Sequence, residues 1–553
     1  MNPSTRESRV ALLKKLIEIP SFTESTAEND AALFIYSHLG AIPYFKAHPE
    51  HLSLIPTPLE KDPRPLHAVC ARVMAKIPTP KTLVLISHYD VVETSMYGEL
   101  QPLACQPNKL ADAFLKSPHL LQPQALEDLK SGHFIFGRGA MDMKAGVALE
   151  LELLRDFAAG HLDLDANLLL LVVPDEENTS AGMRGAISAL KTLQETEGLR
   201  YIAGINTEPS SCCDEGARGE NILFTGTIGK ISPFFYSIGQ SAHVSNYYSG
   251  ISAALLAAHI ITLAEARAEF ADTEGKSPCL PWCCLENRII RESYSVTVPN
   301  RNATFFNTFS LEKSPSQILK EMHEIAENAI AKTIDQLRHS HHKMSQKGYP
   351  LPPFKETLPQ VFTLKELSDK AATRLGSKEL LRIELEKINT DLSGTIRDRE
   401  VQIAETLYRL SDINIPGIII GFLPTYYPAR TCRPDSPIDA PLLKTIPQLI
   451  EKARIYGEEL HIVEAFSGIC DLSFLGFQGN IKELLTYEEN LPSQGLNCKI
   501  PNDDLAALDM PVLNLGVRGY DAHQISERLD TRYSFDILPK LLAYALKTLS
   551  KES

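Results

Sequence analysis

Several features that would place this chain in particular protein classes are absent. Ten of its 553 residues are cysteines, but no two are separated by two residues, so a Cys-x-x-Cys zinc finger is excluded. The longest purely apolar runs, such as Leu168–Val173, are too short to cross a bilayer. Residues Met1–Pro20 resemble an amphipathic helix, whereas a signal peptide has an uninterrupted apolar segment. We therefore expect a cytoplasmic protein with reduced cysteines and no membrane partner.

Basic residues are also in deficit. The chain has 55 Lys and Arg against 69 Asp and Glu, a net charge of −14, so nucleic acid is a poor candidate partner. With 44% hydrophobic residues, the composition excludes disorder. At about 150 residues per domain, the length allows three or four domains, or one large α/β domain with an insert.

Short apolar runs alternate with helical stretches over most of the chain. This alternation predicts an α/β fold with a mostly parallel sheet flanked by helices. From about Glu220 to Gln336 the order changes to strand, helix, strand, strand, helix, with Tyr294–Pro299 and Ala303–Leu311 expected as a β-pair. This order predicts an inserted α+β domain. We expect the catalytic domain at 1–218 and 341–553, the second part beginning with a helical extension, and the insert at 219–340. The polar segment His339–Gly348 is expected to be a surface loop.

The apolar run Thr82–Ser87 leads directly into His88-Tyr-Asp90. Residues two apart on an extended chain point the same way, so Asp90 can support the His88 imidazole and orient its other nitrogen toward a metal. A structural histidine with a carboxylate partner is the alternative, and this motif alone does not decide between them.

Acidic residues follow other predicted strands. Pro174-Asp-Glu176-Glu177 comes after a continuous apolar run, and Glu208 follows Tyr201–Asn206. Asp142 lies in a glycine turn before a helix, where it could instead be an N-cap. His523 follows the apolar run Pro511–Leu515. The acids could be a solvated loop, but the carboxyl ends of parallel strands meet at one edge, where mixed His and carboxylate ligands suit two zinc ions bridged by one carboxylate.

The order of these motifs resembles a known family. His-x-Asp, Gly-Arg-Gly-Ala-x-Asp-Met-Lys-x-Gly, Glu-Glu, Glu-Pro-Ser and Ala-His-x-x-x-Glu occur as in the co-catalytic zinc hydrolases of metallopeptidase family M20. That family includes aminoacylases, acetylornithine deacetylase, succinyl-diaminopimelate desuccinylase and carboxypeptidases. Three segments are also similar to its arginine-utilisation branch: Gly226–Lys230, Tyr426–Pro428 and Gly468–Phe474.

The resemblance implies a role for each motif residue. Asp142 bridges two zinc ions, with cobalt or manganese as possible substitutes. His88 and Glu208 bind one ion, and Glu177 and His523 bind the other. Two further acids assist: Asp90, which supports His88, and Glu176, which is the general base.

The resemblance also implies a homodimer. Ser241-Ala-His243 looks like the lid motif of the family, whose histidine reaches a neighbouring subunit's site and stabilises the oxyanion. A histidine in a simple turn is the alternative.

Arg518 and Arg301 are candidates for binding a substrate carboxylate, and exposed arginine is the alternative for Arg518. Asp142 follows His88 by more residues than is usual in the family, because Glu93–His133 contains an insertion.

The sequence therefore predicts a zinc-dependent amide hydrolase, a metallopeptidase or N-acyl-amino-acid deacylase, acting on a small molecule or short peptide. A non-catalytic binding or regulatory protein on the same fold is the alternative. That alternative predicts a lost ligand or base, and all seven metal-site positions hold competent residues.

Overall fold

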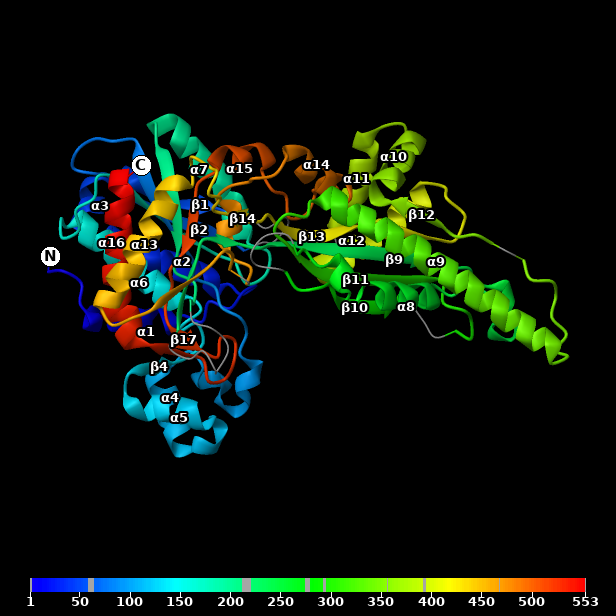
Figure 1. Ribbon diagram of the computed structural model, residues 1–553, viewed down its shortest axis with the longest axis horizontal. Helices are drawn as coiled ribbons and strands as arrows, with labels where there is room; N and C mark the ends of the chain where they lie inside the picture. The colour runs from blue at the N-terminus through cyan, green and yellow to red at the C-terminus, as the bar shows by residue number, and fades with distance from the viewer. Residues whose placement is uncertain are drawn as a thin grey trace. The chain divides into compact units, whose positions relative to one another are not determined.

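The computed structural model describes residues 2–57, 64–210, 220–273, 279–291, 295–355, 357–390, 394–466 and 468–552. The chain packs as two compact units, drawn in Figure 1. Unit 1 comprises Met1–Ile228, Ala429–Gln478 and Pro501–Ser553, and unit 2 comprises Gly229–Pro428 and Gly479–Ile500. The predicted domain limits at 218 and 340 stay a prediction. Among the described residues, no helix has the length and apolar character needed to cross a membrane.

Unit 1 is built on an eight-stranded sheet. Its order is β1 (Leu52–Pro56), β2 (His67–Val73), β5 (Asn167–Val173), β3 (Lys81–His88), β6 (Arg200–Asn206), β16 (Val512–Asn514), β7 (Asn221–Phe224) and β15 (Leu460–Val463). The four central strands, β5, β3, β6 and β16, are mutually parallel. Their side chains are buried along almost their whole length, as expected where helices cover both faces. The predicted α/β class is confirmed.

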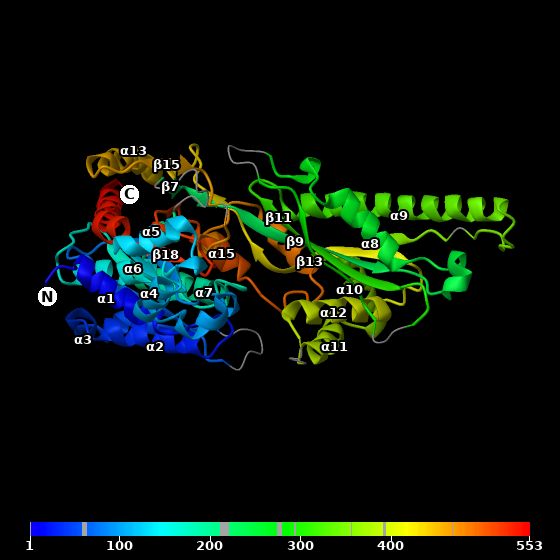
Figure 2. The same ribbon diagram turned by 90° about the horizontal axis from the view of Figure 1, so that it is seen from below.

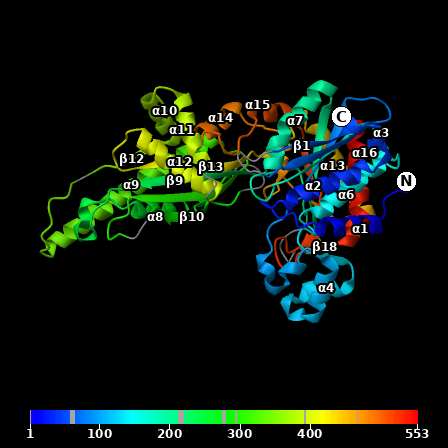
Figure 3. The same cartoon turned by 180° about the vertical axis from the view of Figure 1, so that it is seen from behind.

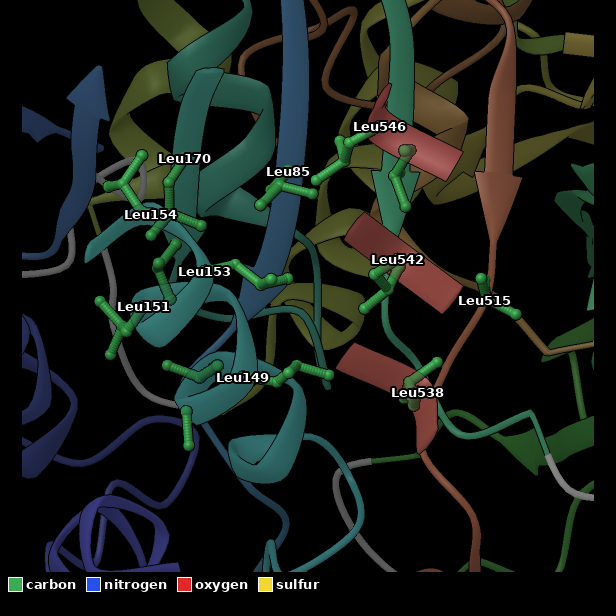
Figure 4. Packing of buried hydrophobic residues seen from close by; sticks show 14 of the residues in the cluster. Leu85, Leu149, Leu151, Leu153, Leu154, Leu170, Leu515, Leu538, Leu542 and Leu546 are labelled. Atoms are coloured by element: carbon green, nitrogen blue, oxygen red, sulfur yellow. The ribbon is translucent and has the colours of Figure 1, made fainter. Parts of the chain in front are cut away.

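Helices pack against both faces of this sheet. Leucines of α6 (Lys144–Ala158) and α16 (Leu538–Glu552) join leucines of β3 and β5 in one buried cluster, shown in Figure 4. Helix α7 (Ala181–Glu197) carries a separate buried stripe. The remaining α-helices of unit 1 outside the insert described next are α1 (Arg6–Ile17), α2 (Ala27–Gly40), α3 (Pro43–Ala47), α13 (Ala440–Ile455) and α15 (Asn502–Leu508). The core fixes the positions of β3, β5 and α6. It therefore also holds the loops that follow the two strands and the turn that precedes the helix.

A helical insert lies between β3 and β4 (Phe134–Phe136). It consists of the 3-10 segment η2 (Ser95–Leu103) and helices α4 (Pro107–Lys116) and α5 (Pro123–Ser131), and it has a small apolar core of its own. Figure 3 shows α4 in a lobe apart from the eight-stranded sheet. A second small sheet joins the lobe to the unit, in the order β17 (Gly519–Tyr520), β18 (Arg528–Asp530) and β4.

Unit 2 contains a five-stranded sheet. Its order is β10 (Cys283–Ile289), β11 (Arg301–Ser310), β9 (Gly229–Ile238), β13 (Gly417–Tyr427) and β12 (Gln360–Thr363). Figure 2 shows helices on both of its faces: α8 (Ala253–Ala264) and α9 (Pro315–Gln346) on one, and α10 (Leu364–Leu375), α11 (Lys378–Asn389) and α12 (Ile396–Leu410) on the other. Helix α14 (Ile481–Glu489) packs on α9.

Two local predictions in unit 2 are wrong. The described part of the expected strand Tyr294–Pro299 forms only an isolated bridge, at Thr297, and β11 pairs instead with β10 and β9. The expected loop His339–Gly348 begins as helix, because α9 continues to Gln346. Polar residues are tolerated on an exposed helix face, and the first backbone break comes at Gly348, which has a φ of +84°.

Candidate metal centre

The central strands of unit 1 end at one edge with acidic or imidazole side chains. His88 is the last residue of β3, Glu176 and Glu177 follow β5, and Glu208 follows β6. The Nε2 atom of His88 lies 3.2 Å from Glu208 Oε1 and 3.7 Å from Glu176 Oε2. Residues distant in sequence therefore meet where the parallel strands end, as the sequence predicts.

Asp142 lies at the middle of this cluster. Its Oδ1 atom is 3.4 Å from His88 Nε2, and its Oδ2 atom is 3.2 Å from His523 Nε2. The same His523 nitrogen is 3.0 Å from Glu177 Oε1. Helix α6 has Met143 as its N-cap residue, so the alternative of Asp142 as a helix cap is excluded. Each carboxylate oxygen of Asp142 thus faces a different histidine.

Asp90 organises the turn that carries the two glutamates. Its carboxylate accepts hydrogen bonds from the backbone N–H groups of Glu176 (3.1 Å) and Glu177 (3.2 Å). Its Oδ1 atom also lies 3.4 Å from His88 Nδ1. Asp90 is fully buried. Asp90 therefore fixes the acidic turn after β5 through its carboxylate, and it fixes the His88 ring through its backbone carbonyl, 3.0 Å from His88 Nδ1, together with the nearby carboxylate.

The backbone around Glu208 requires a glycine in the neighbouring strand end. A Cβ atom at Gly516, just after β16, would lie 1.5 Å from the carbonyl oxygen of Glu208. No side chain fits in that space. Glycine at 516 is therefore what allows the segment after β16 to approach the Glu208 turn.

Burial and neighbouring charges shift the pKa values of the site residues. Burial raises the pKa of Glu176 well above its usual range and raises that of Glu208 to about 8. Burial disfavours the charged form of His88, but Glu208 and Asp142 outweigh it and raise the pKa of the imidazole. Hydrogen bonds to Asp142 and Glu177 raise the pKa of His523 to about 10. Asp142 has a lowered pKa, since the attraction of the two neighbouring histidines exceeds the effect of its burial.

The donor set fits divalent cations. At this edge of the sheet, three groups of side chains have ligand atoms within 4.8 Å of one another: His88, Asp142 and Glu208; His88, Glu176 and Glu177; and Asp142, Glu177 and His523. The Nε2 atom of His88 is buried and has no hydrogen-bond partner among the described residues. A buried imidazole nitrogen without a partner, surrounded by carboxylates, is the arrangement that a cation would satisfy.

Three predicted site residues lie outside this cluster. In unit 2, His243 is exposed, and its Nδ1 atom lies 2.7 Å from Ser245 Oγ. Arg301, also in unit 2, pairs with Glu405 at 2.8 Å. The Arg518 guanidinium in unit 1 is bonded to Glu458, Asp530 and Asn221 and stacks on Tyr533 at 4.2 Å. Substrate binding by the two arginines stays a prediction, and their observed partners are carboxylates of the protein.

Two residues of the motifs received no role from the sequence. Arg138, in the glycine turn, and Glu527, four residues after His523, form a buried ion pair with 2.5 Å between Nη1 and Oε2. Each lies in a motif beside a predicted ligand. That proximity in sequence was the available signal, but the pairing depends on a contact across 389 positions.

Comparison with known proteins places these features in a family. Residues 84–508 match the family model described as peptidase family M20/M25/M40. The chain is 33% identical to the uncharacterized protein YqjN of Bacillus subtilis, over 100% of this chain and 98% of that protein. It is 29% identical to protein RocB of Bacillus subtilis, over 98% and 94%. Among solved structures, it resembles a tripeptidase from Staphylococcus aureus with a TM-score of 0.52 and 14% identity, covering 100% of both chains, which shows a shared fold.

Proposed function

The chain belongs to peptidase family M20/M25/M40 and is a metal-dependent hydrolase, and from that premise we propose that it cleaves the amide bond of a small N-acyl amino acid or short peptide. The observation that carries this proposal is the position of Asp142. Its two carboxylate oxygens face two different histidines, each with a further carboxylate beside it. This geometry suits a bridging ligand between two metal ions.

In the proposed centre, Asp142 would be a ligand of both ions. His88 and Glu208 would complete one set of ligands, and Glu177 and His523 would complete the other. Imidazole and carboxylate ligands favour zinc, and they also accept cobalt or manganese. When bound, the ions would polarise the substrate carbonyl and lower the pKa of a water molecule.

Glu176 is the proposed general base. Its carboxylate is buried at the same edge of the sheet. Glu177, its neighbour in sequence, is the proposed metal ligand, so the role of base falls to Glu176. It would take a proton from the attacking water and then donate that proton to the leaving nitrogen. Asp90 keeps the Glu176 backbone and the His88 ring in fixed positions through the contacts described above.

His243 is proposed to act in a homodimer. Its exposed imidazole is available to a neighbouring subunit, and its Nδ1 atom is held by Ser245, which leaves Nε2 to donate toward an oxyanion. The alternative of a non-catalytic protein predicts a missing ligand or base. The seven motif positions 88, 90, 142, 176, 177, 208 and 523 retain theirs.

A substrate screen tests the proposal. Protein reconstituted with zinc, cobalt or manganese would be assayed against N-acetyl and N-succinyl amino acids, dipeptides and tripeptides, alongside chelator-treated protein. We expect hydrolysis that is lost on chelation and restored by a divalent metal. Absence of bound metal together with absence of hydrolysis across the panel would refute the proposal. Hydrolysis of acyl amino acids but not of peptides would identify a deacylase.

A further inference from the structure

The buried ion pair Arg138–Glu527 lies next to the proposed metal centre and connects three segments of unit 1. Arg138 is 1% exposed and Glu527 is 0% exposed. One segment is the glycine turn that precedes Asp142, the second is the loop that carries His523, and the third is the helical insert. A buried ion pair requires good geometry and further hydrogen bonds to offset the loss of hydration, and this pair has both.

Glu527 holds the backbone next to Asp142. Its Oε1 atom accepts a hydrogen bond from the backbone N–H of Met141 at 3.3 Å, and Met141 immediately precedes Asp142. The backbone N–H of Gly137, at the start of the same turn, donates to the Glu527 carbonyl at 3.2 Å. The side chain and the backbone of Glu527 therefore both fix the turn that presents the bridging carboxylate.

Arg138 holds the backbone of His523. Its Nη2 atom donates to the His523 carbonyl at 3.1 Å, while Nη1 contacts Glu527 at 2.5 Å. His523 has a φ of +63°, a left-handed conformation that a residue with a side chain rarely adopts unless its surroundings impose it. The contact to its carbonyl is one such constraint. The ion pair thus holds the backbone of His523 and of Met141, the residue before Asp142. The side chains of Asp142 and His523 face each other at 3.2 Å.

The helical insert covers the outer side of the pair. The Arg138 guanidinium stacks over the Tyr97 ring at 5.4 Å and contacts Met96 Sδ at 3.3 Å. The backbone N–H of Arg138 donates to Ala104 at 2.9 Å. Ile525, in the His523 loop, packs on the apolar core of the insert. The insert therefore supplies an aromatic face and a dry environment for the guanidinium.

We propose that Arg138 and Glu527 are positioning residues for the metal held by Asp142, Glu177 and His523, and that the insert at 93–133 supports them. This inference rests on the proposed function, because it takes those three side chains as ligands. Neither residue of the pair is assigned a contact with metal or substrate. Groups that orient ligands in this way typically change metal affinity by 10- to 100-fold when they are replaced.

The test is a chelator titration of zinc-loaded protein, with bound zinc measured per chain. In Glu527→Gln the amide can still accept from Met141, but Arg138 loses its counter-charge. We expect one of the two zinc ions to be lost at a chelator strength about 10- to 100-fold lower than in the unmodified protein. The visible spectrum of the cobalt-substituted protein should change for one site of the two.

A matched control separates positioning from stability. Arg430 and Asp439 form another buried pair in unit 1, both 0% exposed and 2.6 Å apart. Asp439→Asn should lower the temperature of unfolding as Glu527→Gln does, but leave the chelator titration unchanged. If both variants lower the unfolding temperature and neither changes zinc retention, Arg138–Glu527 has only a structural role and the inference is overturned.

Variants of Tyr97 test the insert even if Glu527→Gln does not fold. The Tyr97 hydroxyl makes no hydrogen bond among the described residues, so Tyr97→Phe keeps the contact between the aromatic ring and the Arg138 guanidinium. Tyr97→Leu removes the aromatic face and is expected to weaken retention of one zinc ion by about 3- to 10-fold, given the modest strength of a cation–π contact. Equal retention in the two variants would contradict a role for the insert. If the unmodified protein binds no zinc, the proposed function fails first, so the two failures are distinguishable.

Discussion

Buried carboxylates have different surroundings in the two units. In unit 2, Asp272 is 1% exposed and accepts three backbone hydrogen bonds of 2.8 Å. In unit 1, Glu176 and Glu208 lie beside each other and share one imidazole, His88. The Asp272 carboxylate is satisfied by backbone amides, whereas Glu176 and Glu208 crowd around one imidazole. The difference indicates that carboxylates crowded around a shared imidazole mark the functional edge, because such an arrangement is unfavourable without a cation.

The largest expected effect follows from replacing the proposed base. Glu176→Gln keeps the size of the side chain but cannot take a proton, so kcat should fall by about 10²- to 10⁴-fold. Zinc content should stay unchanged, since Glu176 is not a proposed ligand. Steady-state kinetics and metal analysis on the same preparation check this prediction.

Glu195→Gln is the control for that measurement, because Glu195 is 65% exposed on α7. Its kinetics should match those of the unmodified protein. Activity that persists in Glu176→Gln would remove Glu176 from the role of base.

Replacing Asp272, the satisfied carboxylate of unit 2, should affect stability instead of catalysis. Asp272→Asn weakens hydrogen bonds to the N–H groups of Leu311, Glu312 and Lys313. We expect the free energy of unfolding to fall by about 2 kcal/mol. Urea unfolding checks this value, with the exposed Asp335→Asn expected to stay within about 0.5 kcal/mol. A loss at Asp335 equal to that at Asp272 would break the comparison.

Glu150 is an unsatisfied carboxylate that is not a predicted ligand. It is fully buried in α6, where its Oε1 atom accepts a hydrogen bond from Thr207 at 2.9 Å and its Oε2 atom has no hydrogen-bond partner within the described part of the chain. Burial raises the pKa of Glu150 well above its ordinary value, although the neighbouring hydroxyl groups of Ser87 and Thr207 oppose this shift. The folded state therefore binds this proton more tightly than the unfolded state does.

The sign of the pH effect follows from that shift. The contribution of Glu150 to stability is complete below the unfolded pKa of about 4.3 and is lost as the pH rises toward the folded pKa. The gain in unfolding free energy of Glu150→Gln over the unmodified protein should therefore be larger at pH 8 than at pH 5. Urea unfolding at both pH values checks this difference, and Glu195→Gln should show no such trend. A gain that shrinks with rising pH would contradict the assignment.

The sequence predicts where the candidate site lies better than it predicts the residues that hold the site in position. His88, Glu176 and Glu208 could be placed because each follows an apolar run, and the ends of parallel strands converge whatever the details of packing. The Arg138–Glu527 pair could not be predicted, since it depends on how the insert and two loops pack together. The extension of α9 was missed because a polar composition does not distinguish an exposed helix face from a loop.

The two arginines predicted to bind substrate give the smallest expected effect. Arg301 is 21% exposed and pairs with Glu405, so Arg301→Met should lower the free energy of unfolding by only about 0.5–1 kcal/mol. Arg518→Met removes a more enclosed group, 12% exposed, and should cost more stability. Because both guanidinium groups are already bonded to carboxylates of the protein, KM should change less than about twofold in each variant. A KM increased tenfold at unchanged kcat would instead identify that arginine as a substrate ligand, because it is the signature of lost binding that is uniform between ground and transition states.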